Sequence, residues 1–270
     1  MKKEHVSIIL PTYNRASLIK KAIDSVLEQT YPYFELIVVD DGSTDDTKKQ
    51  IEEYRDSRIR YVNPGYNQGA AGARNYGIQC AQYDYIAFED SDDVWRPSKL
   101  EKQMQVLVQS TENVGFCYHK ILYHMGNHMQ AILPAETVEL EKKSGNIYAQ
   151  LLWDNLVGCP TILAKRSCIE KTKGFDTKLK ALEDYDFALQ MAAHAQAVFI
   201  DEILMDARYA TDGVSGNMAN YLTASILILE KYKKDYLDTD TFRHRLEIIL
   251  RDSERLGVEG QVVSLLEKIL

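Results

Sequence analysis

The stretch Tyr85-Ile86-Ala87-Phe88-Glu89-Asp90-Ser91-Asp92-Asp93-Val94-Trp95 joins a short apolar run to a dense group of acids. The first four residues predict a buried strand, and Arg96-Pro97-Ser98 predicts a helix start, because Pro is tolerated in the first helical turn. The acids then lie at the carboxyl end of a strand, where open α/β sheets bind ligands. An acidic run alone is more often a solvated loop, but this position favours a divalent cation held by carboxylates and substrate phosphates.

Three strand–helix units lead up to this stretch. Apolar runs at Val6–Leu10, Phe34–Val39 and Ile59–Val62 predict strands, and segments with helical spacing of apolar residues follow each of them. Alternating strands and helices predict a parallel sheet with right-handed crossovers. The fold class is therefore α/β, with a mostly parallel central sheet flanked by helices, and polar features after successive strands should meet at one edge.

Two further features belong to that edge. Asp40-Asp41 follow the second strand, and Gly69–Gly77 (GAAGARNYG) opens the third helix. Small residues at a helix N-terminus let backbone approach an anion, although glycines also serve tight helix–sheet packing. Arg74, within the same helix, is equally compatible with an anion site and with a structural ion pair.

The second half of the chain is less regular. We expect a strand at 115–118, a helix at 147–156 that carries Trp153, a strand at 161–164 and a last strand at 198–200. Asp184 falls in the first turn of another predicted helix, where a carboxylate can simply cap the helix dipole. His119, His124 and His128 are close in sequence, but Gly126-Asn127 between them indicates a hairpin turn rather than a metal site.

From about Met218 the pattern changes to three amphipathic helices without recognisable chemistry. We expect them to pack onto the preceding domain, because their apolar faces need cover. A dimer contact and a membrane-surface contact are the alternatives.

Composition excludes several classes of protein. The chain has 270 residues, a net charge of −8 and 45% hydrophobic residues, which is ordinary globular composition without the basic surface that nucleic acids require. The four cysteines form no CxxC pair, and no apolar run approaches the length of a membrane span. With a strand predicted from Val6, there is no room for a signal peptide. We expect a soluble cytoplasmic protein with reduced thiols.

Five motifs, taken together, resemble the family 2 glycosyltransferases. They are VSIILPTYNR at 6–15, VVDDGSTDD at 38–46, GAAGARNYG at 69–77, DSDDVW at 90–95 and GFDTKLKALED at 174–184. The resemblance covers roughly residues 4–215 and keeps the family's motif order. It implies a Rossmann-like GT-A domain over 1–217, with a nucleotide-binding half at 1–110 and an acceptor-binding half at 111–217. Residues 218–270 would be a C-terminal helical extension.

The resemblance also implies roles for individual residues. Asp92 would be the more direct metal ligand of the DxD motif, with Asp90 nearer the ribose, and Asp184 would be the catalytic base. Pro11, Thr12 and Tyr13 would line the nucleotide base. The complete set implied on the donor side is Pro11, Thr12, Tyr13, Arg15, Asp40, Asp41, Gly69, Arg74, Asp90 and Ser91. Glu183 and Trp153 would lie on the acceptor side.

The activity implied by the resemblance is inverting sugar transfer in cell-surface polysaccharide synthesis. The donor would be a nucleotide-diphosphate sugar, such as a UDP-hexose or UDP-N-acetylhexosamine, and the acceptor a hydroxyl of a glycan or lipid-linked molecule. Mn²⁺ or Mg²⁺ would stabilise the departing diphosphate, and one carboxylate would suffice as general base. A lipid-linked acceptor would bring the protein to the inner face of the plasma membrane as a peripheral protein.

Two positions depart from the family pattern. Ala207-Arg208-Tyr209-Ala210 lacks the His of the family's Tyr-Arg-x-His pattern, so Asp212 or water would replace it. Glu89 stands where an apolar residue is common.

Two other functions compete with this interpretation. A sugar-1-phosphate nucleotidyltransferase would need a Gly-rich basic loop in place of Leu10–Asn14, and the chain has none. A non-catalytic nucleotide-binding module of the same fold would be indicated by loss of Asp92 or Asp184, and both are present.

Overall fold

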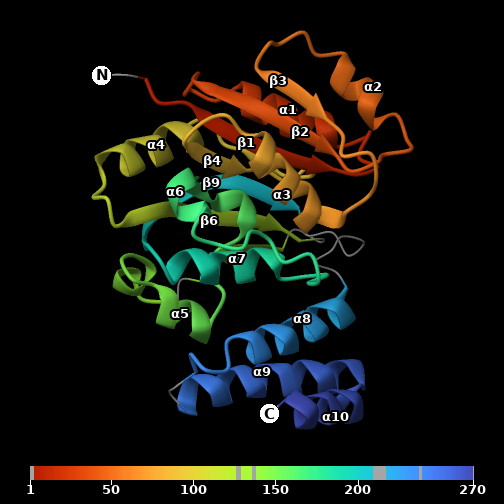
Figure 1. Cartoon of the computed structure of the whole chain (residues 1–270), viewed down its shortest axis with the longest axis vertical. Helices are drawn as coiled ribbons and strands as arrows, with labels where there is room; N and C mark the ends of the chain where they lie inside the picture. Colours follow the sequence, from red (N-terminus) through yellow and green to blue (C-terminus); the bar gives the residue numbers. More distant parts are fainter. Residues whose placement is uncertain (1–2, 126–128, 136–137, 209–216, 237–238, 270) are drawn as a thin grey trace.

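The computed structural model describes residues 3–125, 129–135, 138–208, 217–236 and 239–269. Within these ranges, nine strands form one sheet with helices on both faces, and a layer of C-terminal helices lies at one end of the molecule (Figure 1). The predicted α/β fold class with a C-terminal helical extension is confirmed.

The first half of the chain is a parallel sheet, as predicted. Its elements are β1 (Val6–Thr12), α1 (Ile19–Leu27), β2 (Phe34–Asp40), α2 (Thr47–Glu52), β3 (Ile59–Val62), α3 (Gly69–Cys80) and β4 (Tyr85–Phe88). The spatial order β3-β2-β1-β4 is parallel throughout. Side chains of β1 alternate between two cores, with Ile8 and Leu10 on one face and Ile9 on the other. Strand alternation therefore explains why both faces need helices.

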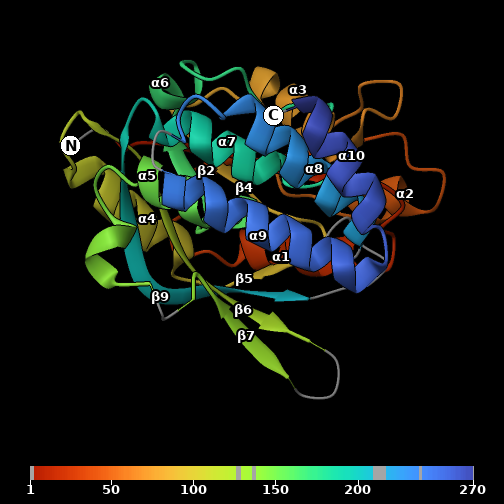
Figure 2. The same cartoon turned by 90° about the horizontal axis from the view of Figure 1, so that it is seen from below.

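The second half adds strands of mixed direction. Its elements are β5 (Val94–Trp95), α4 (Lys99–Gln109), β6 (Val114–His124), β7 (Gln130–Leu133), α5 (Tyr148–Trp153), β8 (Leu163–Lys165), α6 (Arg166–Ile169), α7 (Glu183–Ala192) and β9 (Gln196–Arg208). β8 lies antiparallel between β4 and β6, whereas β6 and β9 run parallel. β6 and β7 form a hairpin that projects from the body of the protein (Figure 2). The hairpin is confirmed, although Gly126, Asn127 and His128 lie outside the described residues.

The segment after the acidic run differs from the prediction. Val94-Trp95 forms the short strand β5, which pairs antiparallel with β9 through Val94↔Asp206 and Trp95↔Met205. The Arg96 amide donates to the Leu204 carbonyl at 2.8 Å, and helix α4 begins only at Lys99. The acidic residues therefore occupy a turn between two strands of the same sheet. Both ends of this turn are held by ladder hydrogen bonds.

Three C-terminal helices pack on the domain, as expected: α8 (Met218–Lys231), α9 (Thr239–Leu256) and α10 (Glu259–Ile269). Apolar residues of α8, including Leu222 and Ile226, belong to the same buried cluster as Tyr185 of α7. The Tyr232 hydroxyl donates to Asp186 Oδ1 at 2.8 Å. These contacts attach the helical layer to α7, while the domain boundary at 217 stays a prediction.

Two other expectations concern the whole chain. All four cysteines are free thiols, and three of them are buried. In the described part of the chain, no helix combines the length and hydrophobicity that crossing a bilayer requires.

A packing prediction follows from Gly77, where α3 approaches the sheet. A Cβ built at this position would lie 2.4 Å from Ile9 Cγ2 and 3.2 Å from Val39 Cγ2. We expect Gly77→Ala to lower the free energy of unfolding by about 1–3 kcal/mol through overpacking, measured by chemical denaturation. Gly260→Ala in α10 is the matched control, because nothing lies within 4 Å of its Cβ position. Equal stability of both variants would contradict the close approach of α3 to the sheet.

Candidate functional site

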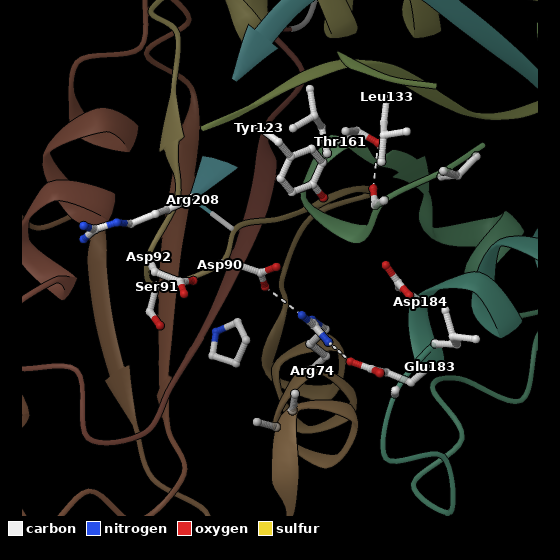
Figure 3. A pocket seen from close by; sticks show the side chains of 18 of the residues that line it. Arg74, Asp90, Ser91, Asp92, Tyr123, Leu133, Thr161, Glu183, Asp184 and Arg208 are labelled. Carbon is white, nitrogen blue, oxygen red and sulfur yellow. Dashed lines mark hydrogen bonds and ion pairs between the residues drawn. The ribbon is translucent and has the colours of Figure 1, made fainter. Parts of the chain in front are cut away.

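A cavity of about 810 Å³ lies along the carboxyl edge of the parallel strands. Both halves of the chain contribute to its wall (Figure 3). The predicted site residues that line it are Pro11, Thr12, Tyr13, Arg15, Asp41, Gly69, Arg74, Asp90, Ser91, Asp92, Glu183 and Asp184. Residues far apart in sequence thus meet in one space, as the parallel topology predicts.

Asp41 builds one end of the cavity by holding the start of α3. Its carboxylate accepts hydrogen bonds at 2.8 Å from the backbone amides of Gln68 and Gly69. Gly69 has a φ of +76°, a left-handed conformation that favours glycine. Burial raises the pKa of the Asp41 carboxyl, and the two amide hydrogen bonds oppose that rise. The Asp41 amide also donates to the Thr12 carbonyl at 2.9 Å, which joins the ends of β1 and β2.

Asp40 and Trp153 lie away from the cavity wall, contrary to the expectation for both. Asp40 is 1% exposed, and its carboxylate accepts from the Ser43 amide at 2.8 Å and from the Tyr61 hydroxyl at 2.7 Å. Strand alternation turns it away from its neighbour Asp41. Trp153 stacks on His244 of α9 with ring centroids 4.1 Å apart. Both residues make contacts within the protein, and neither is among the residues that line the cavity.

Arg74 bridges two acids that face each other across the cavity. Its guanidinium donates to Asp90 Oδ1 at 2.6 Å and to Glu183 Oε1 at 2.8 Å. The bridge is visible in Figure 3, where Arg74 lies between the acidic turn and α7. Of the two interpretations that the sequence left open for Arg74, the structure shows the ion pair. The pair also connects the first half of the chain with the second.

The acidic turn divides into an outer and an inner pair of carboxylates. Asp90 and Asp92 line the cavity, whereas Glu89 is fully buried and Asp93 is 7% exposed. Burial raises the pKa of both inner carboxyls, and the negative charge of neighbouring acids adds to this effect. This shift of the inner acids toward their protonated form reduces the repulsion that four charged carboxylates would have in one turn.

Glu89, the charged departure from the family pattern, has a buried cation in its neighbourhood. Lys99 is fully buried, donates to Gln103 Oε1 at 2.8 Å and lies 3.6 Å from the centroid of the Trp95 ring. Burial lowers the pKa of Lys99 to about 7, while the Glu89 charge acts in the opposite direction. The acid at position 89 is thus accompanied by a basic group beneath the same turn.

Asp90 and Asp92 fit a divalent cation that also has a phosphate ligand. They present two carboxylates on one side of the cavity (Figure 3). In the described part of the chain, no three His, Cys, Asp or Glu side chains form a cluster suited to a metal. Mg²⁺ and Mn²⁺ commonly take one or two carboxylates and complete their shell with substrate phosphates and water. The donor set suits a substrate-completed site rather than an all-protein cage.

The histidines do not add to this donor set. His119 is buried, with Nδ1 2.9 Å from the Lys120 carbonyl, and His124 Nε2 lies 2.8 Å from Asp206 Oδ1. These two ring nitrogens thus have partners within the protein. Tyr209, Ala210 and Asp212, around the missing family His, lie outside the described residues.

Asp184 lies on the opposite wall, in the first turn of α7. Leu182, just before this helix, has a φ of +58°, and this left-handed residue turns the chain into α7. Asp184 Oδ2 accepts from the Cys159 amide at 3.2 Å and Oδ1 from the Tyr185 amide at 2.8 Å. Burial raises the pKa of Asp184 to about 6, with a further rise from Glu183 and an opposing effect of Arg74. A fixed carboxyl group with a pKa near neutrality is suited to proton transfer.

Several cavity residues were not identified from the sequence. His119, Ile121, Tyr123 and Met125 alternate along β6 and its end, and all line the cavity. Arg208, the last residue of β9, lies on the same side of the cavity as Asp92 (Figure 3). The period-two pattern along 119–125 was available in the sequence as a signal for a strand with one face toward a ligand. The strand predicted at 115–118 ends before these residues.

Known proteins match both the sequence and the fold. The family model described as glycosyl transferase family 2 matches residues 7–169. A relative from Escherichia coli, UDP-Glc:alpha-D-GlcNAc-diphosphoundecaprenol beta-1,3-glucosyltransferase WfgD, is 38% identical over 164 residues, which are 61% of this chain. The chain covers 61% of that relative's own length.

Two solved structures share the fold with this chain. One is TarS (residues 1–349) of S. aureus in complex with UDP-GlcNAc, with a TM-score of 0.68, 20% identity, and coverage of 92% of this chain and 71% of the solved TarS chain. The other is the mannosyltransferase PcManGT of Pyrobaculum calidifontis in complex with GDP-Man and Mn²⁺. Its TM-score is also 0.68, with 20% identity, and coverage of 98% of this chain and 75% of that protein. These neighbours confirm the GT-A fold that the resemblance implied.

A stability prediction follows from the Arg74 bridge. Arg74→Met would leave Asp90 and Glu183 facing each other without their cation, and Glu183 is buried. We expect the free energy of unfolding to fall by about 3 kcal/mol, because removing one partner of a buried ion pair leaves the opposite charge uncompensated. Arg243→Met, in an exposed pair with Asp240, is the control and should change stability little. Similar denaturation midpoints for the two variants would show that the Arg74 bridge does not contribute to the free energy of unfolding.

Proposed function

This chain belongs to glycosyl transferase family 2, and from that premise we propose that it transfers a sugar from a nucleoside-diphosphate donor to an acceptor hydroxyl. The observation that supports this most strongly is the cavity itself. Asp90 and Asp92 line one wall, Asp184 lines the opposite wall, and Arg74 spans the space between them. A cation-binding side and a proton-accepting side thus face each other, as sugar transfer from a diphosphate requires.

The proposed donor is a UDP-hexose or a UDP-N-acetylhexosamine. Its nucleotide would lie at the end formed by Pro11, Thr12, Tyr13 and Asp41, all of which line the cavity. The Asp41 carboxylate accepts three hydrogen-bond contacts from the backbone amides of Gln68 and Gly69. A carboxylate has about four acceptor sites, so it can accept one more donor, such as a base N–H. The relative from Escherichia coli is named for UDP-Glc, and TarS was solved with UDP-GlcNAc. Both names support a UDP-linked donor.

The proposed cofactor is Mn²⁺ or Mg²⁺, held by Asp92 and Asp90. When bound, the cation would offset the charge that develops on the departing diphosphate. One oxygen of Asp90 already accepts from Arg74, which leaves its other oxygen for this role. The PcManGT complex, which contains Mn²⁺, supports a metal-dependent reaction on this fold.

Asp184 is the proposed general base. Its two backbone hydrogen bonds hold the carboxylate on the wall opposite the acidic turn. From there it would take the proton of the acceptor hydroxyl while the diphosphate leaves on the other side. Attack from the face opposite the leaving group, in a single displacement, inverts the anomeric carbon. Glu183 would help to shape the acceptor side through its bond to Arg74.

The proposed acceptor is a glycan or lipid-linked molecule of cell-surface polysaccharide synthesis. Its end of the cavity is mostly apolar, with Leu133, Leu156 and Val157 in the wall. The relative from Escherichia coli is named for an acceptor linked to diphosphoundecaprenol. A similar acceptor would place the reaction at the inner face of the plasma membrane, with this protein in peripheral contact.

One prediction separates the proposed enzyme from a module that only binds nucleotide. We expect Asp184→Asn to bind UDP in the presence of Mn²⁺ as the wild type does, because the change lies on the opposite wall from the acidic turn. Transfer from UDP-sugars should fall by about 10²–10⁴-fold, the usual contribution of a general base. UDP release in a panel of UDP-sugars and acceptors is the measurement, and Asp201→Asn, an exposed change on β9, is the control. Normal turnover by Asp184→Asn would refute the assignment.

A second prediction concerns pH. Asp184 must be deprotonated to act as base, and its pKa is raised to about 6. We therefore expect kcat/KM to increase with pH through about 6 and to level off above it, because kcat/KM reports ionisations of the free enzyme. Steady-state rates between pH 5 and 8 provide the test. A profile without an ascending limb in this range would contradict Asp184 as the group that accepts the proton.

A further inference from the structure

Tyr123 lies in the cavity at a position that the proposed mechanism does not use. It belongs to β6, where its neighbours across the sheet are Ala131 of β7 and Ala207 of β9. Pairing on both sides fixes its backbone. Figure 3 shows its hydroxyl directed into the space between Asp90 and Asp184.

The surroundings of Tyr123 make its hydroxyl a hydrogen-bond donor. Burial, the largest cause, raises the pKa of the phenol. The group therefore keeps its proton throughout the physiological range. Tyr123 is partly buried, and the hydroxyl of such a phenol usually has a polar partner. Among the described residues, no hydrogen bond satisfies this hydroxyl, so the cavity's ligand is the partner that the geometry leaves for it.

The position of Tyr123 between the two walls of the cavity indicates which ligand group its hydroxyl would meet. Ile121 and Met125, which flank Tyr123 on the same face, offer no hydrogen-bond donor. If the proposed function holds, the leaving diphosphate lies toward Asp90 and Asp92, and the incoming hydroxyl lies toward Asp184. The transferred sugar must occupy the gap between them, because attack and departure take place on opposite faces of its anomeric carbon.

We propose that Tyr123 is a positioning and specificity residue whose hydroxyl donates a hydrogen bond to a hydroxyl oxygen of the transferred sugar. This inference rests on the proposed function and goes beyond it, since it names a residue that recognises the transferred sugar. The simple structural alternative is a tyrosine whose ring only fills the core, because its ring packs against a buried cluster around β1. The two accounts differ in what the oxygen atom does.

The first arm of the test is Tyr123→Phe, which removes the oxygen and keeps the ring. We expect Mn²⁺-dependent UDP binding to stay within about twofold of wild type, because UDP carries no transferred sugar. The value of kcat/KM for the UDP-sugar donor should fall about tenfold, the usual effect of one lost hydrogen bond. Tyr54→Phe is the matched control, since the Tyr54 hydroxyl donates to Asp24 and neither residue lines the cavity.

The second arm uses monodeoxy analogues of the accepted UDP-sugar with both enzymes. For the one analogue that lacks the contacted hydroxyl, wild type should lose about tenfold, and Tyr123→Phe should lose nothing more. For the other analogues, the two losses should add. A Tyr123→Phe enzyme equal to wild type with the full sugar, or losses that add for every analogue, would overturn the inference.

The outcomes also distinguish this inference from the proposed function. Failure of wild type to bind UDP with Mn²⁺ and to turn over any UDP-sugar would refute the proposed function, and the inference with it. Turnover by wild type together with an unchanged Tyr123→Phe enzyme would refute only the role of Tyr123.

Discussion

The Arg74 guanidinium, bonded to Asp90 on one side and to Glu183 on the other, is the constraint on which the site depends. Asp90 belongs to the turn after β4, and Glu183 begins α7, so the bridge sets the distance between the two walls of the cavity. Without the cation, two acids would face each other in a partly buried space, where repulsion is poorly screened. The same positive charge opposes the rise in the pKa of Asp184 and so keeps that carboxyl able to lose its proton near neutrality.

The fold gives different surroundings to the carboxylates for which we propose different roles. Asp90 and Asp92 open onto the cavity from a turn that is held between two strands, whereas Asp184 lies against backbone amides at a helix start. Burial then raises the pKa of Asp184 and of the inner acids Glu89 and Asp93. Different environments give the carboxylates of one site different pKa values, and such a site can combine cation binding with proton transfer.

Local patterns in the sequence predicted the parallel half of the fold well, because each strand and helix there is formed by neighbouring residues. The strands at Ile59–Val62 and Tyr85–Phe88 have the predicted bounds. The errors arise where distant residues decide. Val94-Trp95 forms a strand by pairing with β9, and Trp153 stacks on His244, a residue about 90 positions later in the chain. Asp40 and Asp41 cannot be told apart by composition, yet only Asp41 lines the cavity. Tyr123 lies in the part of β6 beyond Tyr118, which the sequence pattern did not predict as a strand.

The central claim is that the cavity binds a nucleoside diphosphate with the help of a cation on the acidic turn. Calorimetric titration of UDP, GDP and dTDP into the wild-type protein, each with and without Mn²⁺, tests it most directly. The account predicts that UDP binds most tightly of the three and that its affinity depends on Mn²⁺. Binding of none of the three nucleotides under either condition would contradict the account.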